Sequence, residues 1–299
     1  MAAAYADRLI EKVRAKRTPL CVGLDPFADK MPAALFGDPA RDPAAALVKF
    51  GTSVIDVAAK HAAVLKPQLG LFEQFGEMGY AAARMLCEYG RNAGMIVLLD
   101  AKRGDIGTTA EGYARATLGP APGFDADCVT VNPYMGKDTL APFVDMAKAH
   151  GKGVAVLVRT SNPGAGDFQD LQVGGAPVWR RVAEMLAPET QALMGASGWS
   201  GLMAVAGATY PEEARTLREA MPHALFLVPG YGAQGASAAD AVAGFVATAQ
   251  GLEGGIVNSS RGVTYPPAAQ AAKNMSEWRA AVDDAMRAAA EELRTACAR

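Results

Sequence analysis

Two acids and a base follow a single apolar run, and their spacing makes them the strongest candidates for chemistry in this sequence. The run covers residues 95–99, and Asp100, Lys102 and Asp105 come directly after it. Side chains two residues apart on a strand project from the same face, so Asp100 and Lys102 should share one side of the strand's carboxyl end. Asp105 must then lie in the following loop. A lysine flanked by carboxylates is stabilised as the ammonium, which makes it a poor Schiff-base nucleophile but a good proton donor to a developing carbanion.

These residues sit within a regular alternation of two kinds of segment. Short, nearly continuous apolar stretches predict strands at residues 19–25, 63–68, 95–102, 128–133, 153–161, 201–208, 224–229 and 255–259. Amphipathic patterns between them predict helices at 44–60, 72–89, 108–117, 137–150, 178–194, 211–221, 238–250 and 268–297. Eight such units favour an α/β fold of the closed (β/α)8 TIM-barrel type over an open doubly wound sheet. We expect one domain over residues 1–299, with an N-terminal helical extension and a C-terminal helix.

Composition narrows the classes of function. The 299 residues are 51% hydrophobic and 20% charged, as in a globular protein with a large core. A net charge of -2 provides no electrostatic attraction to nucleic acid or to an anionic membrane, so neither is expected as a partner. No run reaches the roughly 18 apolar residues of a membrane span. The four cysteines lack CxxC spacing and indicate buried thiols in a reducing compartment, so a cytoplasmic location is expected.

Polar residues end most of the predicted strands, which is where the active sites of such barrels lie. Asp25 ends the first strand and Lys66 the second. Asp25 precedes a proline and could instead only shape a turn. Lys66 also precedes a proline, which favours an extended strand end; a surface lysine is the alternative. For Asp105 the alternative is a helix N-cap, but a capping box at residues 108–111 predicts that the helix begins at Thr108 and leaves Asp105 in the loop.

Residues 230–235 spell GxGxxG between a strand and a helix. A dinucleotide-binding fold would need an acid at the end of the next strand, and that strand ends in Asn258-Ser259-Ser260 instead. Glycines still let backbone N–H groups approach a phosphate, and the last two loops of a barrel are its usual phosphate site. Arg261 could add a bidentate clamp. The alternative is that these glycines serve only tight turns.

The ordered set of motifs resembles the orotidine 5'-phosphate decarboxylases, in the longer-chain branch of that family. The resemblance rests on residues 100–106 together with Asp25 and Lys66, and it extends to residues 161–164, 229–235 and 260–262. It thus runs through all eight predicted strands in the family's order. It implies decarboxylation of orotidine 5'-phosphate to uridine 5'-phosphate in pyrimidine biosynthesis, without a cofactor or a metal.

The resemblance also implies a role for each matched position. Lys102 would protonate C6 of the pyrimidine as carbon dioxide leaves, and Asp100 would lie near the departing carboxylate and fix Lys102. Lys66 and Asp25 would have two tasks. They would hold Lys102 or Asp100 in place, and they would bind the ribose hydroxyls. The remaining positions would bind the base edge (Ser161), bind the phosphate (Gln234 and Arg261), or reach into the other subunit's site of an obligate homodimer (Asp105 and Thr109).

Two other functions remain open at this point. A metal-dependent sugar-phosphate decarboxylase or epimerase on the same barrel would need a carboxylate at the end of the second strand, where Lys66-Pro67-Gln68 stands. A cation there would also be repelled by Lys66 and Lys102. A non-catalytic nucleotide-binding barrel would bind without turnover, but it gives no reason for Asp100 and Lys102 to be paired.

Overall fold

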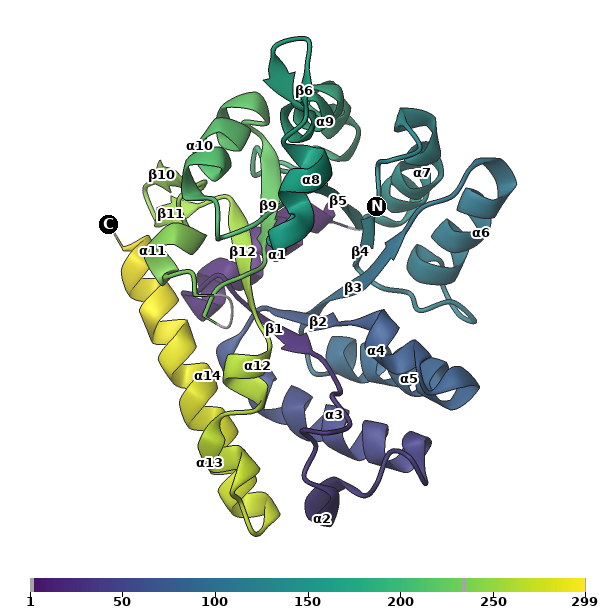
Figure 1. Ribbon diagram of the computed structural model, residues 1–299, viewed down its shortest axis with the longest axis vertical. Helices are drawn as coiled ribbons and strands as arrows, with labels where there is room; N and C mark the ends of the chain where they lie inside the picture. The colour runs from purple at the N-terminus through teal and green to yellow at the C-terminus, as the bar shows by residue number, and fades with distance from the viewer. Residues whose placement is uncertain (1–2, 233–234, 299) are drawn as a thin grey trace.

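The computed structural model describes residues 3–232 and 235–298, and it shows a closed barrel of parallel strands surrounded by helices (Figure 1). Each of the eight predicted strands is present, and the predicted fold class is confirmed. Neighbouring strands pair in parallel, and the last strand pairs with the first. The order around the barrel is β1 (Leu20–Leu24), β2 (Val64–Pro67), β3 (Ile96–Arg103), β4 (Cys128–Val131), β5 (Gly153–Arg159), β8 (Ser200–Ala206), β9 (Ala224–Val228) and β12 (Gly255–Ser259).

Helices cover the outside of the barrel, as the amphipathic patterns predict. The longer ones are α3 (Pro43–His61), α5 (Gly76–Asn92), α6 (Gly107–Leu118), α7 (Ala141–His150), α9 (Val178–Leu186), α10 (Pro211–Ala220) and α14 (Met275–Cys297). Short helices in the connections are α2 (Ala33–Phe36), α4 (Leu69–Glu73), α8 (Gly166–Gln169), α11 (Ala238–Ala241), α12 (Arg261–Thr264) and α13 (Pro267–Gln270), and β6 (Gln172–Val173) pairs with β7 (Ala176–Pro177). Among the described residues, none of the helices has the length and apolar character that a transmembrane span needs.

The amino end of the barrel is closed by the first helix, α1 (Tyr5–Lys16). Tyr5, Leu9 and Ile10 are buried against the residues that fill the barrel interior. The ring of Tyr5 lies directly against Gly153, where a Cβ would come within 2.5 Å of it, so this close approach requires a glycine. This packing fills the amino end of the barrel interior, whereas a cavity opens at the carboxyl ends of the strands.

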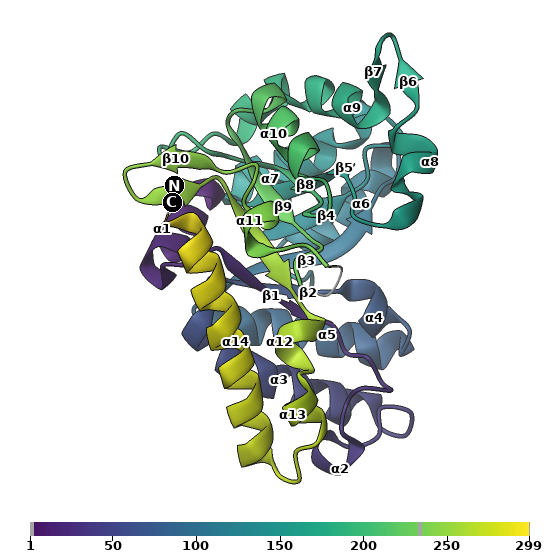
Figure 2. The same ribbon diagram turned by 60° about the vertical axis from the view of Figure 1, so that its left-hand side comes forward.

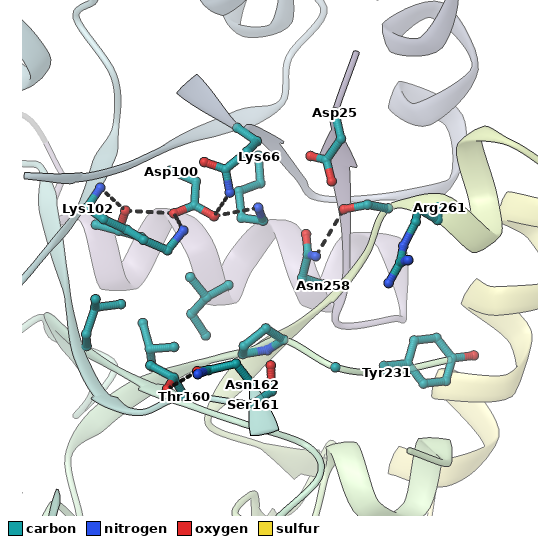
Figure 3. A pocket seen from close by; sticks show the side chains of 18 residues that line it. Asp25, Lys66, Asp100, Lys102, Thr160, Ser161, Asn162, Tyr231, Asn258 and Arg261 are labelled. Atoms are coloured by element: carbon teal, nitrogen blue, oxygen red, sulfur yellow. Dashed lines mark hydrogen bonds and ion pairs between the residues drawn. The ribbon is translucent and has the colours of Figure 1, made fainter. Parts of the chain in front are cut away.

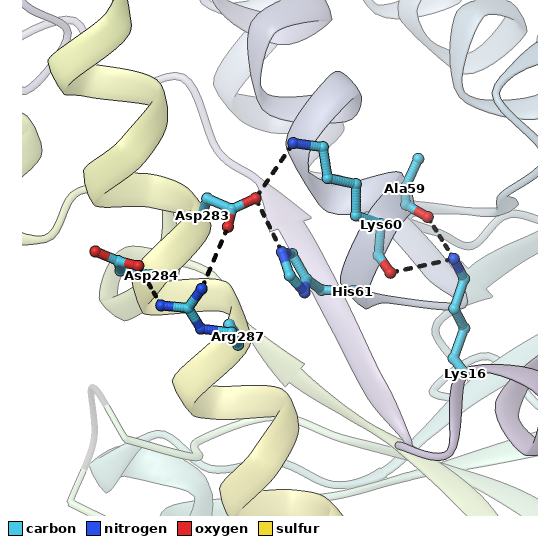
Figure 4. Close-up of polar contacts among 7 residues, drawn as sticks. All are labelled: Lys16, Ala59, Lys60, His61, Asp283, Asp284 and Arg287. Carbon is cyan, nitrogen blue, oxygen red and sulfur yellow. Dashed lines mark hydrogen bonds and ion pairs between the residues drawn. The ribbon is translucent and has the colours of Figure 1, made fainter.

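The C-terminal helix α14 runs along the outside of the barrel beside α3 and α13 (Figure 2). Asp283 of α14 contacts two residues at the end of α3: its Oδ1 lies 3.1 Å from His61 Nε2 and 3.3 Å from Lys60 Nζ (Figure 4). Arg287 lies 3.9 Å from the other Asp283 oxygen, and Lys16 of α1 donates to backbone carbonyls at the same end of α3. These polar contacts join three helices that are far apart in the sequence.

The prediction of one helix over residues 238–250 is wrong. Helix α11 covers only Ala238–Ala241, and β10 (Val246–Thr248) and β11 (Gly251–Glu253) then form a hairpin. Gly251 and Gly254 have φ of 105° and 120°, which favour turns over helix. Buried Arg218 donates to the carbonyls of Gly244 and Gly254, so tertiary contacts also fix this segment.

Four other predicted helices are divided, and the start of α6 differs from the predicted one. The segments 72–89, 137–150, 178–194 and 268–297 each contain a break, at residues 74–75, 140, 187 and 271–274. Helix α6 begins at Gly107 with Ile106 as its N-cap, and no side chain caps it, so the expected capping box is absent. The amide of Ala110 already bonds to the Ile106 carbonyl, which starts the helix before Thr108.

Candidate active site

A cavity of about 460 Å³ opens at the carboxyl ends of the barrel strands (Figure 3). Apolar side chains of β5, β8 and β9 form part of its lining. Its polar lining comes from loops and strand ends all around the barrel, and includes Asp25, Lys66, Gln68, Asp100, Lys102, Thr130, Thr160, Ser161, Asn162, Tyr231, Asn258, Ser260 and Arg261. Most of the polar strand ends singled out in the sequence therefore meet in one place.

Asp100 is the centre of the polar network. Its Oδ2 accepts hydrogen bonds from Lys66 Nζ at 2.8 Å and Gln68 Nε2 at 2.9 Å. Its Oδ1 accepts from Lys102 Nζ at 2.5 Å and Thr130 Oγ1 at 2.9 Å. Burial alone would raise the pKa of this carboxyl, but the ammonium groups of Lys66 and then Lys102 outweigh burial and hold the pKa well below its usual range. Asp100 is therefore a carboxylate over the whole physiological pH range.

The two lysines that flank Asp100 differ in exposure. The Lys66 side chain is 5% exposed, whereas that of Lys102 is 46% exposed. Burial disfavours the charged form of Lys66, yet the carboxylates of Asp100 and Asp25 outweigh it and raise the pKa of Lys66 above its usual value. Lys66 is thus a buried, permanently charged support, and Lys102 is the ammonium that a ligand in the cavity can reach.

The backbone at Lys102 departs from a regular strand. Its φ is 47°, a left-handed conformation that is uncommon outside glycine. Its amide donates to Thr130 Oγ1 at 2.9 Å, and the pairing of β3 with β4 shifts register between Leu99 and Arg103. The expectation that Asp100 and Lys102 face the same side is confirmed, since both line the cavity, but a local irregularity and not simple strand alternation places Lys102.

Asp25 contributes to both a turn and the cavity. Its backbone carbonyl accepts from Tyr265 Oη at 2.7 Å and from the amide of Phe27 at 2.9 Å, as a turn requires. Its carboxylate lines the cavity, and the buried Oδ1 has no hydrogen-bond partner among the described residues. A buried acceptor without a partner carries a free-energy cost, and a ligand donor would remove it.

The structure describes part of the region that is expected to bind the phosphate. Arg261, exposed at the start of α12, lines the cavity together with Gly230 and Tyr231. Gly230, Gly232 and Gly235 have φ of 101°, 71° and 89°, so at these three positions the backbone takes a conformation that residues with a side chain rarely adopt. Gln234, expected to bind the phosphate, lies outside the residues that the structure describes.

Asp105 and Thr109 do not reach this cavity within one chain. Asp105 Oδ1 accepts from the amide of Ile106 at 2.8 Å, and Thr109 is exposed on α6. Neither residue lines the cavity. Their expected place in a shared site would therefore require a second copy of the chain.

Reasoning from the sequence missed two residues that hold Asp100. Gln68 comes two residues after Lys66, and it pairs with Asp100 as an isolated bridge beyond β2. The same two-residue spacing that linked Asp100 to Lys102 could have identified Gln68. Thr130 lies inside an apolar strand and is 1% exposed, and a lone threonine in such a strand gives no signal. Among the described residues, no cluster of three or more His, Cys, Asp or Glu is placed to hold a metal ion.

The chain is similar to many known proteins. Residues 18–275 match the family described as "Orotidine 5'-phosphate decarboxylase / HUMPS family". The chain is 39% identical to the orotidine 5'-phosphate decarboxylase of Rhodopirellula baltica, over 97% of each chain. It is 41% identical to that of Deinococcus radiodurans, over 89% of this chain and 90% of the relative.

A solved structure agrees with these sequence matches. The OMP decarboxylase of Leishmania donovani superimposes with a TM-score of 0.75 at 34% identity, covering 98% of both chains. The matched segment contains every residue of the Asp100 network and the cavity lining. The chain therefore belongs to the orotidine 5'-phosphate decarboxylase / HUMPS family.

Proposed function

We propose that this protein decarboxylates orotidine 5'-phosphate to uridine 5'-phosphate, a step of pyrimidine biosynthesis, without a cofactor. The observation that carries the proposal is the reachable ammonium of Lys102, held 2.5 Å from the buried carboxylate of Asp100 at the open end of the barrel. The names of the relatives support the same activity.

The reaction needs one bond to break and one to form at the same carbon. The bond between C6 and the carboxylate carbon breaks, carbon dioxide leaves, and the electron pair stays on C6. Lys102 Nζ then gives its proton to C6, so the product carries hydrogen there and the lysine becomes neutral. Asp100 lies beside the departing carboxylate, and it also holds Lys102 in place for the transfer.

The field of Lys102 supplies only part of the required stabilisation. One ion pair at about 4 Å contributes roughly 4 kcal/mol at an effective dielectric constant near 20. Enzymes typically lower barriers by roughly 8–23 kcal/mol. The rest must come from preorganised neighbours such as Lys66 and from binding energy of the distant phosphate.

The cavity lining and the family resemblance together support a way of holding the nucleotide. Arg261 and Gly230, which line the cavity, would bind the phosphate, with Gln234 as the resemblance implies, and Ser161 would bind the amide edge of the pyrimidine. The orphaned Oδ1 of Asp25 would accept from a ribose hydroxyl. We propose that Asp105 and Thr109 complete the site of a second subunit, so that the enzyme is a homodimer. We further place it in the cytoplasm, in keeping with its four free cysteines.

Turnover in the presence of a chelator tests this function. The purified protein is incubated with orotidine 5'-phosphate and excess EDTA, and the ultraviolet absorbance is followed. Loss of substrate that is abolished in Lys102→Ala is the expected result. Turnover that requires added Mg²⁺ would favour a metal-dependent sugar-phosphate enzyme, and tight binding without turnover would favour a non-catalytic barrel; either would contradict the proposal.

A further inference from the structure

Arg159 ends strand β5 as a buried cation with two acidic partners from different parts of the chain. Its side chain is 3% exposed. Nε donates to Glu213 Oε2 of α10 at 2.5 Å, and Nη1 lies 2.9 Å from Asp170 Oδ1 in the loop that follows β5. The guanidinium also stacks over the ring of Tyr210 at 3.9 Å. The carboxylate of Glu213 alone would balance the charge of the Arg159 guanidinium. The second carboxylate, that of Asp170, therefore requires another explanation.

The residue before Asp170 reaches back to the cavity lining. Gln169 Oε1 accepts from the amide of Thr160 at 3.0 Å, and Gln169 Nε2 donates to Thr160 Oγ1 at 2.7 Å. Thr160 Oγ1 donates in turn to Asn162 Oδ1 at 2.6 Å. Asp170 thus binds Arg159 at the end of β5, and the neighbouring Gln169 binds Thr160, which in turn binds Asn162. These contacts connect the segment around residues 169–170 to the two residues on either side of Ser161.

Ser161 is held from behind as well. The amide of Gly207 donates to the Arg159 carbonyl at 2.9 Å. A Cβ at Gly207 would lie 3.1 Å from both Cα and Cβ of Ser161, so the two backbones are in close contact. Ser161 has little freedom while Arg159 and its loop stay in place.

We infer that Arg159 and Asp170 are positioning residues for pyrimidine recognition. They clamp the loop after β5 so that Gln169 fixes Thr160 and Asn162, and Ser161 between them faces the base. This inference rests on the proposed function, because it takes Ser161 to bind the base edge. Neither Arg159 nor Asp170 lines the cavity, so both act through their neighbours.

The test compares two ligands that differ only in the base. Binding of uridine 5'-phosphate and of ribose 5-phosphate is measured by calorimetry for the wild type, Asp170→Asn and Arg159→Lys. Asp170→Asn should weaken uridine 5'-phosphate about fivefold, which corresponds to about 1 kcal/mol, and leave ribose 5-phosphate unchanged. Arg159→Lys should show a larger loss of the same kind, since an ammonium cannot hold two carboxylates as a fork does. Asp167→Asn, an exposed change in the same loop, is the matched control.

The outcomes separate the inference from the proposed function. Equal weakening of both ligands, or no weakening of either, would overturn the positioning role. Asp170→Asn alters an exposed side chain, so it decides the matter even if Arg159→Lys fails to fold. Wild-type turnover tests the proposed function by itself, whereas only the difference between variants tests this inference.

Discussion

Lys66 and Asp100 form an ion pair in which both side chains are less than a tenth exposed, with 2.8 Å between Lys66 Nζ and Asp100 Oδ2. The second Asp100 oxygen is then left to Lys102, the reachable lysine. The two lysines therefore have different roles. Buried Lys66 keeps Asp100 charged and in place, and Asp100 in turn holds Lys102 at the cavity.

Lys66→Ala should lower kcat without abolishing substrate binding. Asp100 would lose a buried partner, and its shift would move Lys102, which it holds; displacement of a reacting group by about 1 Å can cost on the order of a hundredfold in rate. Steady-state kinetics with orotidine 5'-phosphate measures the effect. Lys60→Ala, a surface lysine on the neighbouring helix, serves as the control. A rate within threefold of the wild type would contradict this division of roles.

Asp100 should make stability depend on pH in acid. Its folded-state pKa lies below its usual value, so its stabilising contribution is complete above the ordinary carboxyl pKa of about 4 and is lost as pH falls from there toward the folded-state pKa. Removing one partner of a buried pair costs about 3–5 kcal/mol, so Asp100→Asn should be less stable by that order near neutral pH. Urea unfolding of both proteins at pH 6 and pH 3 should show the gap narrowing in acid. A gap that is constant or widens would show that the charge of Asp100 does not stabilise the fold.

Arg261→Ala should impair turnover through the phosphate. The variant should lose at least tenfold in kcat/KM with orotidine 5'-phosphate, because a charge-assisted contact to the phosphate contributes about 1.5–3 kcal/mol. With the nucleoside orotidine, which has no phosphate, wild type and variant should be equally slow. If both substrates lost activity in the same proportion, Arg261 would have another role.

Mixing two inactive variants should restore activity if the sites are shared between subunits. Lys102→Ala and Asp105→Asn each damage a different half of the proposed composite site. In a mixed dimer one site carries both changes and the other carries neither, so statistical exchange should recover about a quarter of the wild-type activity. The mixture is assayed after subunit exchange, with each variant alone as the control. Absence of any recovery, with mixed dimers present, would place Asp105 outside the partner's site.

Gly23→Ala should disturb the residue that precedes Arg261. A Cβ at Gly23 would lie 1.8 Å from Ser260 Oγ and 2.8 Å from Ser260 Cβ, so the serine must move. We expect weaker binding of uridine 5'-phosphate in this variant, and recovery when Ser260→Gly removes the clash. Calorimetry on the two single variants and the double variant measures this. Failure of the double variant to recover would point to damage in β1 itself.

Local sequence patterns were sufficient to predict the barrel and most of the polar residues at the carboxyl ends of its strands. Buried parallel strands are almost continuously apolar, so each strand was recognisable by itself, and the polar residue at its end followed. The hairpin at residues 246–253 was not predictable in this way, because Arg218 of α10 fixes the residues on either side of it through hydrogen bonds to the carbonyls of Gly244 and Gly254. Thr130 escaped notice for the same reason: its role depends on which strand lies beside β3.

The sequence by itself determined that Asp25, Lys66, Asp100 and Lys102 stand at the ends of successive strands, since hydrophobic periodicity and chain order are local properties. Only the tertiary structure decided which lysine is buried and which is reachable. That difference arises from the left-handed turn of the backbone at Lys102 and from the neighbours Gln68 and Thr130, which closing the barrel brings to Asp100. Burial and strand pairing depend on the whole fold, so they cannot be deduced from the spacing of residues along the chain.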